Sequence, residues 1–392
     1  MDSAELSLNI ISMKNRLLTA SAVVCTLSVL YKCQEGNALM NRTMKTMKRI
    51  IKTIPLLLLL FLCSCHHRNE VRRIDCQDAE LILSKTVVLE DENDRPMGQI
   101  KDFVVLEDTS VLCTDGFSVY RFDAEGRLKQ RFGERGHATS EYVQLGNLYV
   151  TDRFFYAWDD MSLCLLQYTR EGEFVAKYPG RHTSIRRFCV MGDSLACYYL
   201  AGKGGNQLLA MSLASDSVVY EIDPLSNEDL CLLSYVNSGG LAINQDTLYY
   251  LHPSEITLKK MDDVTPRTVA VYEDKGFHTM RQKTPPRGAQ DLIDYVLDNS
   301  VVSGLSVDNG RFCITTETGV FGREGGVEGC AQRRLNVIML DENYNIKQAL
   351  RFSYPIGMTH YKMYYGRLCA ICSDGERQLM LVYNLPPEVI GQ

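Results

Sequence analysis

Beyond about residue 80 the chain is a succession of short apolar runs, rich in Val, Tyr, Phe, Leu and Ile, separated by Asp, Gly and Asn. Short apolar runs bounded by turn residues predict β-strands. Tight-turn residues recur six times, about every 40 to 65 positions, and in five of these units a second turn follows. Two turn series with one period indicate a repeated four-stranded unit, which is the pattern of β-propeller blades.

The first blade is predicted to have strands at 102–106, 110–114, 118–122 and 128–132. Later blades are predicted at 145–178, 184–222, 238–272, 302–352 and 358–385. The last of these has only three strands, and we expect the segment 80–89 to supply the fourth, because pairing the two ends closes the ring and protects the sheet edges. The predicted fold is therefore an all-β, six-bladed propeller of four-stranded antiparallel blades at 80–385, followed by a tail at 386–392.

A motif in the first blade resembles a known family. It consists of Val119-Tyr120-Arg121-Phe122-Asp123, Gly126-Arg127-Leu128, Phe132-Gly133-Glu134-Arg135-Gly136 and Glu141-Tyr142. This pattern resembles the six-bladed β-propeller lipoproteins of diderm bacteria, which are similar to NHL-type propellers. That family commonly has Gly, Pro and Gly at the positions of Ala138, Thr139 and Ser140. The resemblance implies the fold and export, and it implies no particular activity.

Residues 47–64 predict an export signal. Lys48 and Arg49 precede an apolar run at 54–62, and residues 62–65 read Leu-Cys-Ser-Cys, which resembles the lipobox of bacterial lipoproteins. The apolar run is too short to span a bilayer, which needs about 20 residues. We predict lipidation of Cys65, because a small residue, Ser64, precedes it, whereas Leu62 precedes the poorer candidate Cys63.

Residues 1–46 do not fit an export signal, and a start at Met44 or Met47 would give a signal of ordinary length. We interpret 1–46 as an extension from a misassigned start, and 65–79 as a tether between the lipid and the propeller. The residues directly after the cysteine, His66-His67-Arg68-Asn69-Glu70, lack the acidic cluster that surface-exported lipoproteins of this kind often carry. The periplasmic side of the outer membrane is therefore favoured over the cell surface.

The charge of the chain excludes some partners. The chain holds 42 Lys or Arg and 48 Asp or Glu, and its first 64 residues hold eight and three of these, so residues 65–392 have a net charge of −11. Nucleic-acid binding needs a basic surface, so no nucleic-acid partner is predicted. Anionic lipids would repel such a body, so we assign membrane attachment to the N-terminal lipid alone. We expect a monomer.

Ten cysteines follow Cys65, and seven lie inside predicted strands: Cys113, Cys164, Cys189, Cys197, Cys313, Cys369 and Cys372. We expect them to be buried, where Cys behaves as a small hydrophobic residue. Cys369 and Cys372 also match the CxxC spacing of a redox pair or half a metal site. Residues three apart on a strand point to opposite faces, however, which favours the structural role.

The long connections of the predicted propeller fall into two topological kinds. They are 133–144, 223–237, 273–300 and 317–332, and each joins two blades or joins the second strand of a blade to the third. Both kinds open on one face of a propeller, so we expect that face to be elaborated for binding, with neutral drift of loop length as the alternative. Apolar residues at 292, 293, 296 and 297 predict a short helix there, over the channel mouth or against blade five.

The candidate ligand-binding residues on this face are Arg135, His137, Trp158, Asp159, Asp160 and His252, with Asp115, Lys203, Arg323 and Asp374 beside them. Trp158 followed by two carboxylates suits a glycan, peptide or protein ligand, because the indole can stack while the carboxylates accept hydrogen bonds. The alternative is a core tryptophan at a strand end, whose N–H is bonded locally.

Catalytic signatures are absent from the sequence. It contains no HExxH, GxSxG or zinc-ligand spacing, so no catalytic residue, metal or cofactor is predicted. The predicted function is a lipid-anchored binding or protein-interaction scaffold. The alternative is a hydrolase or lyase of the lactonase-like propeller type, which would need carboxylates and amides in the channel, and its candidates are Asp102, Asn147, Asn237 and Asn244. Three such groups around a cation would favour the enzyme, and an apolar plug would favour binding through the loops.

Overall fold

The computed structural model describes residues 70–89, 97–180, 185–200, 206–224, 239–279, 287–318, 333–353 and 358–387. Cys65 and the whole predicted signal, as well as Lys203, Asn237 and Arg323, lie outside these ranges. Within the described part of the chain, no helix is long and apolar enough to cross a membrane.

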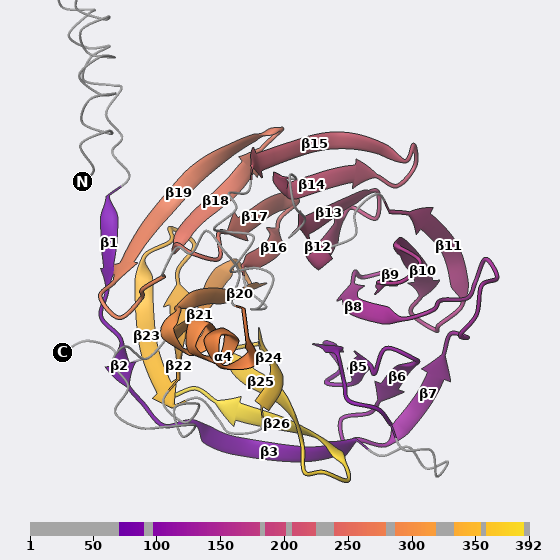
Figure 1. The fold of residues 1–392 in the computed structure, drawn as a ribbon, viewed down its shortest axis with the longest axis horizontal. Helices are drawn as coiled ribbons and strands as arrows, with labels where there is room; N and C mark the ends of the chain where they lie inside the picture. The colour runs from indigo at the N-terminus through magenta and orange to yellow at the C-terminus, as the bar shows by residue number, and fades with distance from the viewer. Residues whose placement is uncertain are drawn as a thin grey trace, which may run out of the picture. The chain divides into compact units, whose positions relative to one another are not determined.

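Six antiparallel sheets surround a central axis (Figure 1). Blade one has β4 (Asp102–Val105), β5 (Val111–Thr114), β6 (Val119–Phe122) and β7 (Leu128–Phe132), blade two has β8 (Leu145–Val150), β9 (Phe154–Asp159), β10 (Cys164–Thr169) and β11 (Phe174–Pro179), and blade three has β12 (Ile185–Met191), β13 (Leu195–Leu200), β14 (Asn206–Ser212) and β15 (Ser217–Pro224). Blade four has β16 (Gly240–Asn244), β17 (Thr247–Leu251), β18 (Thr257–Asp262) and β19 (Thr265–Asp274), and blade five has β20 (Val301–Asp308), β21 (Arg311–Thr318), β22 (Arg334–Leu340) and β23 (Ile346–Ser353). The predicted six-bladed β-propeller is confirmed.

Blade six closes the ring with strands from both ends of the propeller. It consists of β24 (Met358–Tyr364), β25 (Arg367–Ser373), β26 (Gln378–Asn384) and β3 (Ile82–Leu89), which pairs antiparallel with β26. The predicted closing strand is thus confirmed.

Two short strands lie in the segment that the sequence predicts as a tether. β1 (Val71–Ile74) pairs parallel with β19, and β2 (Gln77–Asp78) pairs parallel with β23, so each adds an outer fifth strand to its blade. Ile74 is buried in the core between blades four and five. From Val71 onward the predicted tether is therefore part of the sheet structure. The apolar pattern of residues 71–78 was too short to predict β1 and β2, because an outer strand buries few of its side chains.

The hydrophobic core is divided among the interfaces between blades. Six clusters of buried side chains are found among the described residues, and each joins two neighbouring blades around the ring. Both faces of each sheet therefore contribute apolar side chains to the core, which is why many strands are apolar along most of their length. Packing between blades stabilises the ring without filling the axis.

Five cysteines confirm the prediction of burial, namely Cys113, Cys164, Cys189, Cys197 and Cys369. Cys313 and Cys372 are half-buried. Burial raises the pKa of the Cys369 thiol to about 11, so this thiol stays protonated at neutral pH.

The motif that carries the family resemblance forms the loop between β7 and β8. Gly133 has φ +80° and lies against Tyr142, since a Cβ atom there would come within 2.4 Å of the tyrosine ring. Tyr142 is fully buried, and its hydroxyl donates to the carbonyl of Phe117 at 3.0 Å. A carboxylate oxygen of Glu141 accepts from the backbone N–H of Ala138 at 2.7 Å. These glycine, glutamate and tyrosine positions therefore hold the loop together.

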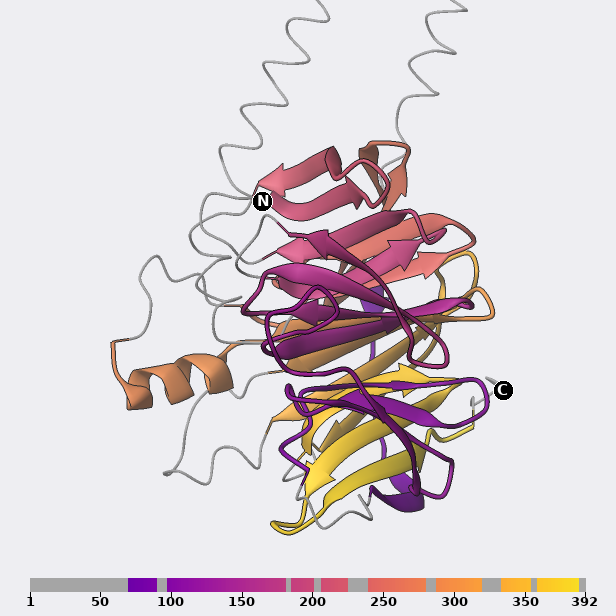
Figure 2. The same ribbon diagram turned by 90° about the vertical axis from the view of Figure 1, so that its right-hand side faces the viewer.

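The predicted helix is present as α4 (Ala289–Asp298), in the connection between blades four and five. Figure 2 shows α4 projecting from one side of the ring, whereas short turns between strands line the other side. Tyr295 is buried, and after the helix the N–H of Ser300 donates to the carbonyl of His278 at 2.6 Å. We call the side that carries α4 the loop face and the opposite side the turn face.

Candidate functional site: the central channel

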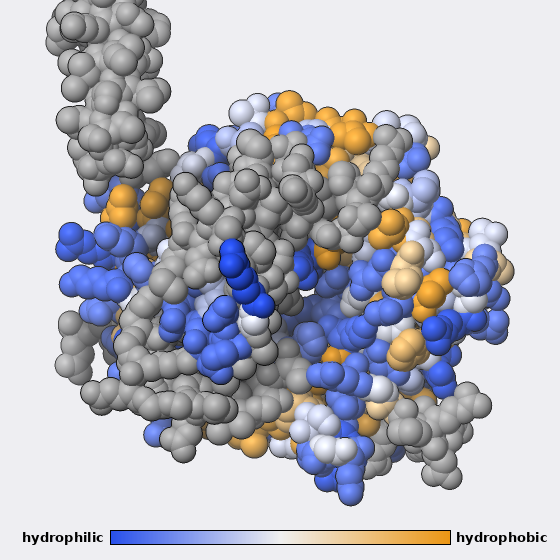
Figure 3. Space-filling view, viewed as in Figure 1, coloured by the Kyte–Doolittle hydropathy of each residue, from blue (hydrophilic) through white to orange (hydrophobic). Residues whose placement is uncertain are grey.

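Two adjoining cavities occupy the axis of the ring. One, of about 450 Å³, lies at the loop face and is called the loop end, and the other, of about 550 Å³, lies at the turn face and is called the turn end. Leu148, Tyr149 and Tyr364 line both cavities, so the two form one channel. Figure 3, which views the loop face, shows hydrophilic residues around the hollow at the centre of the ring.

Every blade contributes to the loop end through the first residues of its innermost strand. These residues are Lys101 and Asp102, Asn147, Arg187, Leu241, Ser303 and His360. The connections between successive blades lead into these positions, so they open at the same end of the channel. This agrees with the blade register expected from the sequence.

The inner strands of four blades carry one extra residue near the loop end. The pairing register shifts between Leu145 and Leu148 in blade two, and between Ile185 and Arg187 in blade three. The shifts in the other two blades are between Val302 and Gly304 and between Met358 and His360. Such bulges redirect side chains and are common beside functional sites. Here they coincide with polar residues that line the cavity.

The two carboxylates of the loop end are held by internal partners. Asp102 pairs with Lys362 at 2.5 Å and also accepts from the N–H of Leu148 at 2.8 Å. Lys362 in turn donates to the carbonyl of Phe103 at 2.8 Å. These bonds fix both side chains in their positions. A carboxylate that already accepts from a cation and a backbone donor has fewer lone pairs free to contact a substrate.

Glu317, which lines the loop end from blade five, is similarly engaged. Its carboxylate pairs with Arg333 at 2.8 Å and accepts from the hydroxyl of Tyr361 at 2.6 Å. Arg333 and Glu317 side chains are 7% and 13% exposed, so this ion pair is largely removed from solvent.

Basic groups at the loop end include two that have no such carboxylate partner. Within the described ranges, no carboxylate lies within 4.0 Å of the charged nitrogens of Lys101 or Arg187. One Arg187 nitrogen donates to the neutral carbonyl of Ser303 at 2.5 Å. Burial lowers the pKa of His360, and the charges of Lys362 and Arg187 lower it further against the opposing effect of Asp102. The cavity thus has a local excess of positive charge.

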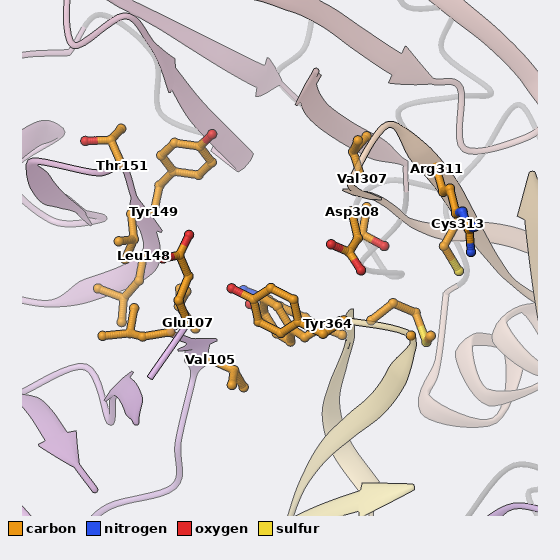
Figure 4. Close-up of a pocket in the computed structure, with 18 of the residues that line it drawn as sticks. Val105, Glu107, Leu148, Tyr149, Thr151, Val307, Asp308, Arg311, Cys313 and Tyr364 are labelled. Carbon is orange, nitrogen blue, oxygen red and sulfur yellow. The ribbon is translucent and has the colours of Figure 1, made fainter. Parts of the chain in front are cut away.

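The turn end has a different character. Figure 4 shows Glu107, Asp308 and Tyr364 pointing into this cavity from blades one, five and six. Asp152, Arg170 and Arg311 also line it. Acidic residues are therefore more numerous here than at the loop end. Among the described residues, no group of three or more His, Cys, Asp or Glu is arranged to hold a metal ion.

Arg135 and His137 are exposed in the loop between β7 and β8, as predicted, but the channel lining does not include them. The guanidinium of Arg135 lies 4.9 Å from the ring centre of Phe117, and the residue forms a parallel bridge with Tyr142. Arg135 is therefore held against its own loop, away from the axis.

Trp158 and Asp159 are buried rather than presented at the surface. Trp158 is 1% exposed in the cluster between blades two and three, with its ring 5.6 Å from that of Tyr198. Asp159 is fully buried and accepts from the backbone N–H groups of 143, 144, 161 and 162. Trp158 thus matches the core alternative that the sequence allowed, because both of its flanking blades press side chains against the indole.

Asp160 is the one member of this triplet near the channel. Its carboxylate lies against Gly146, at the start of β8. Burial raises its pKa, and the charges of Lys101 and Arg186 and a hydrogen bond from Trp158 act in the opposite direction. Asp160 therefore contributes to the electrostatics around Lys101.

The remaining candidates serve local turns. Nδ1 of His252 accepts from the N–H of Ser254 at 3.2 Å and lies 2.8 Å from its hydroxyl oxygen. Asp115 is buried and accepts from the N–H groups of Phe117 and Ser118, and Asp374 accepts from the N–H of Arg377 at 2.7 Å. For the enzyme alternative, Asp102 and Asn147 line the loop end, whereas Asn244 lies at the opposite end of its strand, beside the turn to β17.

Sequence reasoning did not nominate Lys101, Arg187, His360 or Lys362. A signal was present, since Asn147, Arg187, Ser303 and His360 are each the third residue of an inner strand. Aligning the blades on these strands would have placed the four polar residues at one level. The extra residue in each strand breaks the alternation of inward and outward positions, which hid them.

No known protein-family profile matches the chain, and no functionally characterised protein matches it significantly by sequence. Solved structures with a similar fold include an exported protein of Bacteroides fragilis NCTC 9343, at 12% identity and TM-score 0.56, over 81% of this chain and 99% of that one. Another is a member of the DUF4221 family from Bacteroides vulgatus ATCC 8482, at 12% identity and TM-score 0.56, over 79% and 99%. At these identities the similarity establishes the fold, which is the six-bladed β-propeller.

Proposed function

We propose that this protein is an exported, lipid-anchored β-propeller that binds a small ligand at the loop end of its central channel. The observation that carries the proposal is the recurrence of an extra residue in four inner strands, at the level where polar side chains enter the cavity. Four blades share an irregularity that costs ladder hydrogen bonds, and a common site for a ligand accounts for it. A cavity of about 450 Å³ suits a small molecule.

The ion pairs formed by the acidic groups favour binding over hydrolysis or elimination. Asp102, Asn147 and Glu317 do converge at the loop end, as the enzyme alternative requires. Both carboxylates, however, are engaged by basic side chains, and the amide of Asn147 donates to the carbonyl of Arg186 at 3.3 Å. An apolar plug, the other arrangement considered, does not describe this lining either. The polar wall, whose two carboxylates are already paired with basic side chains, supports selective binding.

A bulky residue in the channel is expected to abolish ligand binding. Leu241 lines the loop end and is half-buried, so Leu241→Trp would fill space without removing a polar partner. A small-molecule library would be screened with the wild-type protein by thermal shift, since a ligand that binds the folded state raises the melting temperature with concentration. For each hit, the ligand-induced rise in melting temperature should be mostly or wholly lost in Leu241→Trp.

Val264→Trp supplies the matched control, because Val264 is 55% exposed in a turn on the periphery of blade four. Its thermal shifts should equal those of the wild type. Each hit would then be incubated with the wild-type protein and followed by NMR. An unchanged ligand spectrum supports a binding protein, whereas conversion abolished by Leu241→Trp would identify an enzyme. Hits unaffected by Leu241→Trp would place the binding site elsewhere.

Lipidation of Cys65 is proposed to hold the protein on the periplasmic side of the outer membrane. The variant Cys65→Ala should lose all metabolic labelling by a fatty-acid analogue and leave the membrane fraction, because two acyl chains are needed for stable anchoring. Cys63→Ala is the matched control and should remain labelled. Retention of the label in Cys65→Ala, together with its loss in Cys63→Ala, would move the site to Cys63. Protease treatment of intact cells would separate the periplasmic from the surface location.

A further inference from the structure

The charges at the loop end do not cancel within the site. Lys362 pairs with Asp102, and Arg333 pairs with Glu317. Among the described residues, Lys101 and Arg187 then remain as two positive charges facing a cavity, in a chain whose formal charge is −6. A local positive excess inside an acidic protein favours a bound anion, because like charges that line one cavity repel each other.

The two side chains are held in place by the fold. The stem of Lys101 lies against Gly116, where a Cβ atom would be 3.1 Å from the lysine Cε. Arg187 is fixed by its bond to the carbonyl of Ser303, and its Nε atom is buried and finds no acceptor among the described residues. Buried polar groups are nearly always satisfied, so an Arg with unused donor capacity beside a cavity points to a ligand.

One acidic side chain could oppose this excess. Asp160 acts electrostatically on Lys101, but its carboxylate is shared with Arg186. Asp160 therefore does not belong to Lys101 alone, and no ion pair joins the two side chains within 4.0 Å among the described residues.

The rest of the lining supplies neutral hydrogen-bonding groups. The hydroxyls of Ser303, Thr315 and Tyr361 and the amide of Asn147 lie around the same cavity as Lys101 and Arg187. Leu241 and Leu305 add apolar surface. Such a mixture suits a compact molecule that carries several hydroxyls together with an anionic group, rather than a bare inorganic ion or a hydrocarbon.

We propose that the loop end selects a sugar-sized organic anion, with Lys101 and Arg187 binding its carboxylate or phosphate group. This inference rests on the proposed binding function and adds the chemical class of the ligand. Both anionic groups accept charge-assisted hydrogen bonds from Lys and Arg, and these bonds are stronger than those between neutral groups. His360 and the Lys362–Asp102 pair border the bound anion and set its position.

The test uses three probes built on the same hexose ring, namely glucuronate, glucose 6-phosphate and glucose, titrated into the propeller by ligand-observed NMR and calorimetry. At least one anion should bind the wild-type protein at least tenfold more tightly than glucose, with an affinity that falls as NaCl is added. Lys101→Met and Arg187→Met keep an apolar stem and remove the charge. Each should weaken binding of the anion about tenfold or more and leave glucose unchanged.

Arg127→Met is the control, because Arg127 is an exposed cation in the turn between β6 and β7. It should bind the anion as the wild type does. Thermal unfolding of each variant would separate a loss of affinity from a loss of folding. Lys101→Met guards against instability of Arg187→Met, because among the described residues the Lys101 side chain donates no hydrogen bond to the core. Equal binding of anions and glucose, or an anion affinity unaffected by both variants, would overturn the inference. Absence of binding by both anions would also overturn it. The channel-binding function would survive any of these results if library hits still depend on Leu241.

Discussion

Replacing Val87 by Asp is expected to remove about 4 kcal/mol or more of folding free energy, because a carboxylate would enter an apolar site at the seam where the ring closes. Val87 is 2% exposed in β3 and belongs to the cluster between blades six and one. The same strand passes the turn of blade one, where a Cβ atom on Gly126 would lie 2.0 Å from the carbonyl oxygen of Val88. A loss of this size approaches the whole stability of many domains, which is about 5–15 kcal/mol.

Thr86→Asp provides the comparison on the same strand, because Thr86 is exposed beside the buried Val87. Its effect should stay within about 0.5 kcal/mol. Chemical denaturation would measure both variants, and limited proteolysis would show whether cleavage begins near β3 and β26. Equal stabilities of the two variants would mean that closure by β3 contributes little to the ring.

The second large effect is expected for Trp158→Ala, which should lower the free energy of unfolding by about 3–5 kcal/mol. The indole is enclosed by the cluster between blades two and three, and a Cβ atom on Gly180 would lie 2.3 Å from it. Truncation would therefore leave a cavity that the rigid sheets cannot close. Trp158→Phe should cost less, because it retains much of the apolar volume.

The control for this prediction is Met161→Ala, since Met161 is 64% exposed only three residues away. It should leave stability nearly unchanged. Affinity for a channel ligand, measured well below the melting temperature of Trp158→Ala, should be retained. A stable Trp158→Ala protein that no longer binds its ligand would instead support the role of aromatic anchor suggested by Trp158-Asp159-Asp160.

The sequence determined the ring because a propeller repeats one local pattern. Apolar strands separated by short turns recur in every blade, and many of these turns need residues that accept positive φ, as Asn309 and Gly310 do. The three-stranded last blade similarly indicated that β3 closes the ring, since an open edge is unfavourable.

Tertiary structure alone decided which polar residues form the site. Lys101, Arg187 and His360 are far apart in sequence and meet only because inner strands from three blades begin at one end of the channel. Bulges at Arg187 and His360 also shift the alternation from which a sequence pattern infers orientation.

At Trp158 the sequence suggested a binding site that the structure does not have at the surface, because the neighbouring carboxylates resembled a ligand-binding pattern and the indole is buried. Its environment depends on how closely blade three packs against blade two, and nothing within the segment encodes that distance. The local pattern thus determined strands, turns and closure, because these depend on neighbouring residues and on sheet pairing. The tertiary arrangement decided burial and the convergence of charge, because these depend on contacts between blades that are distant in the chain.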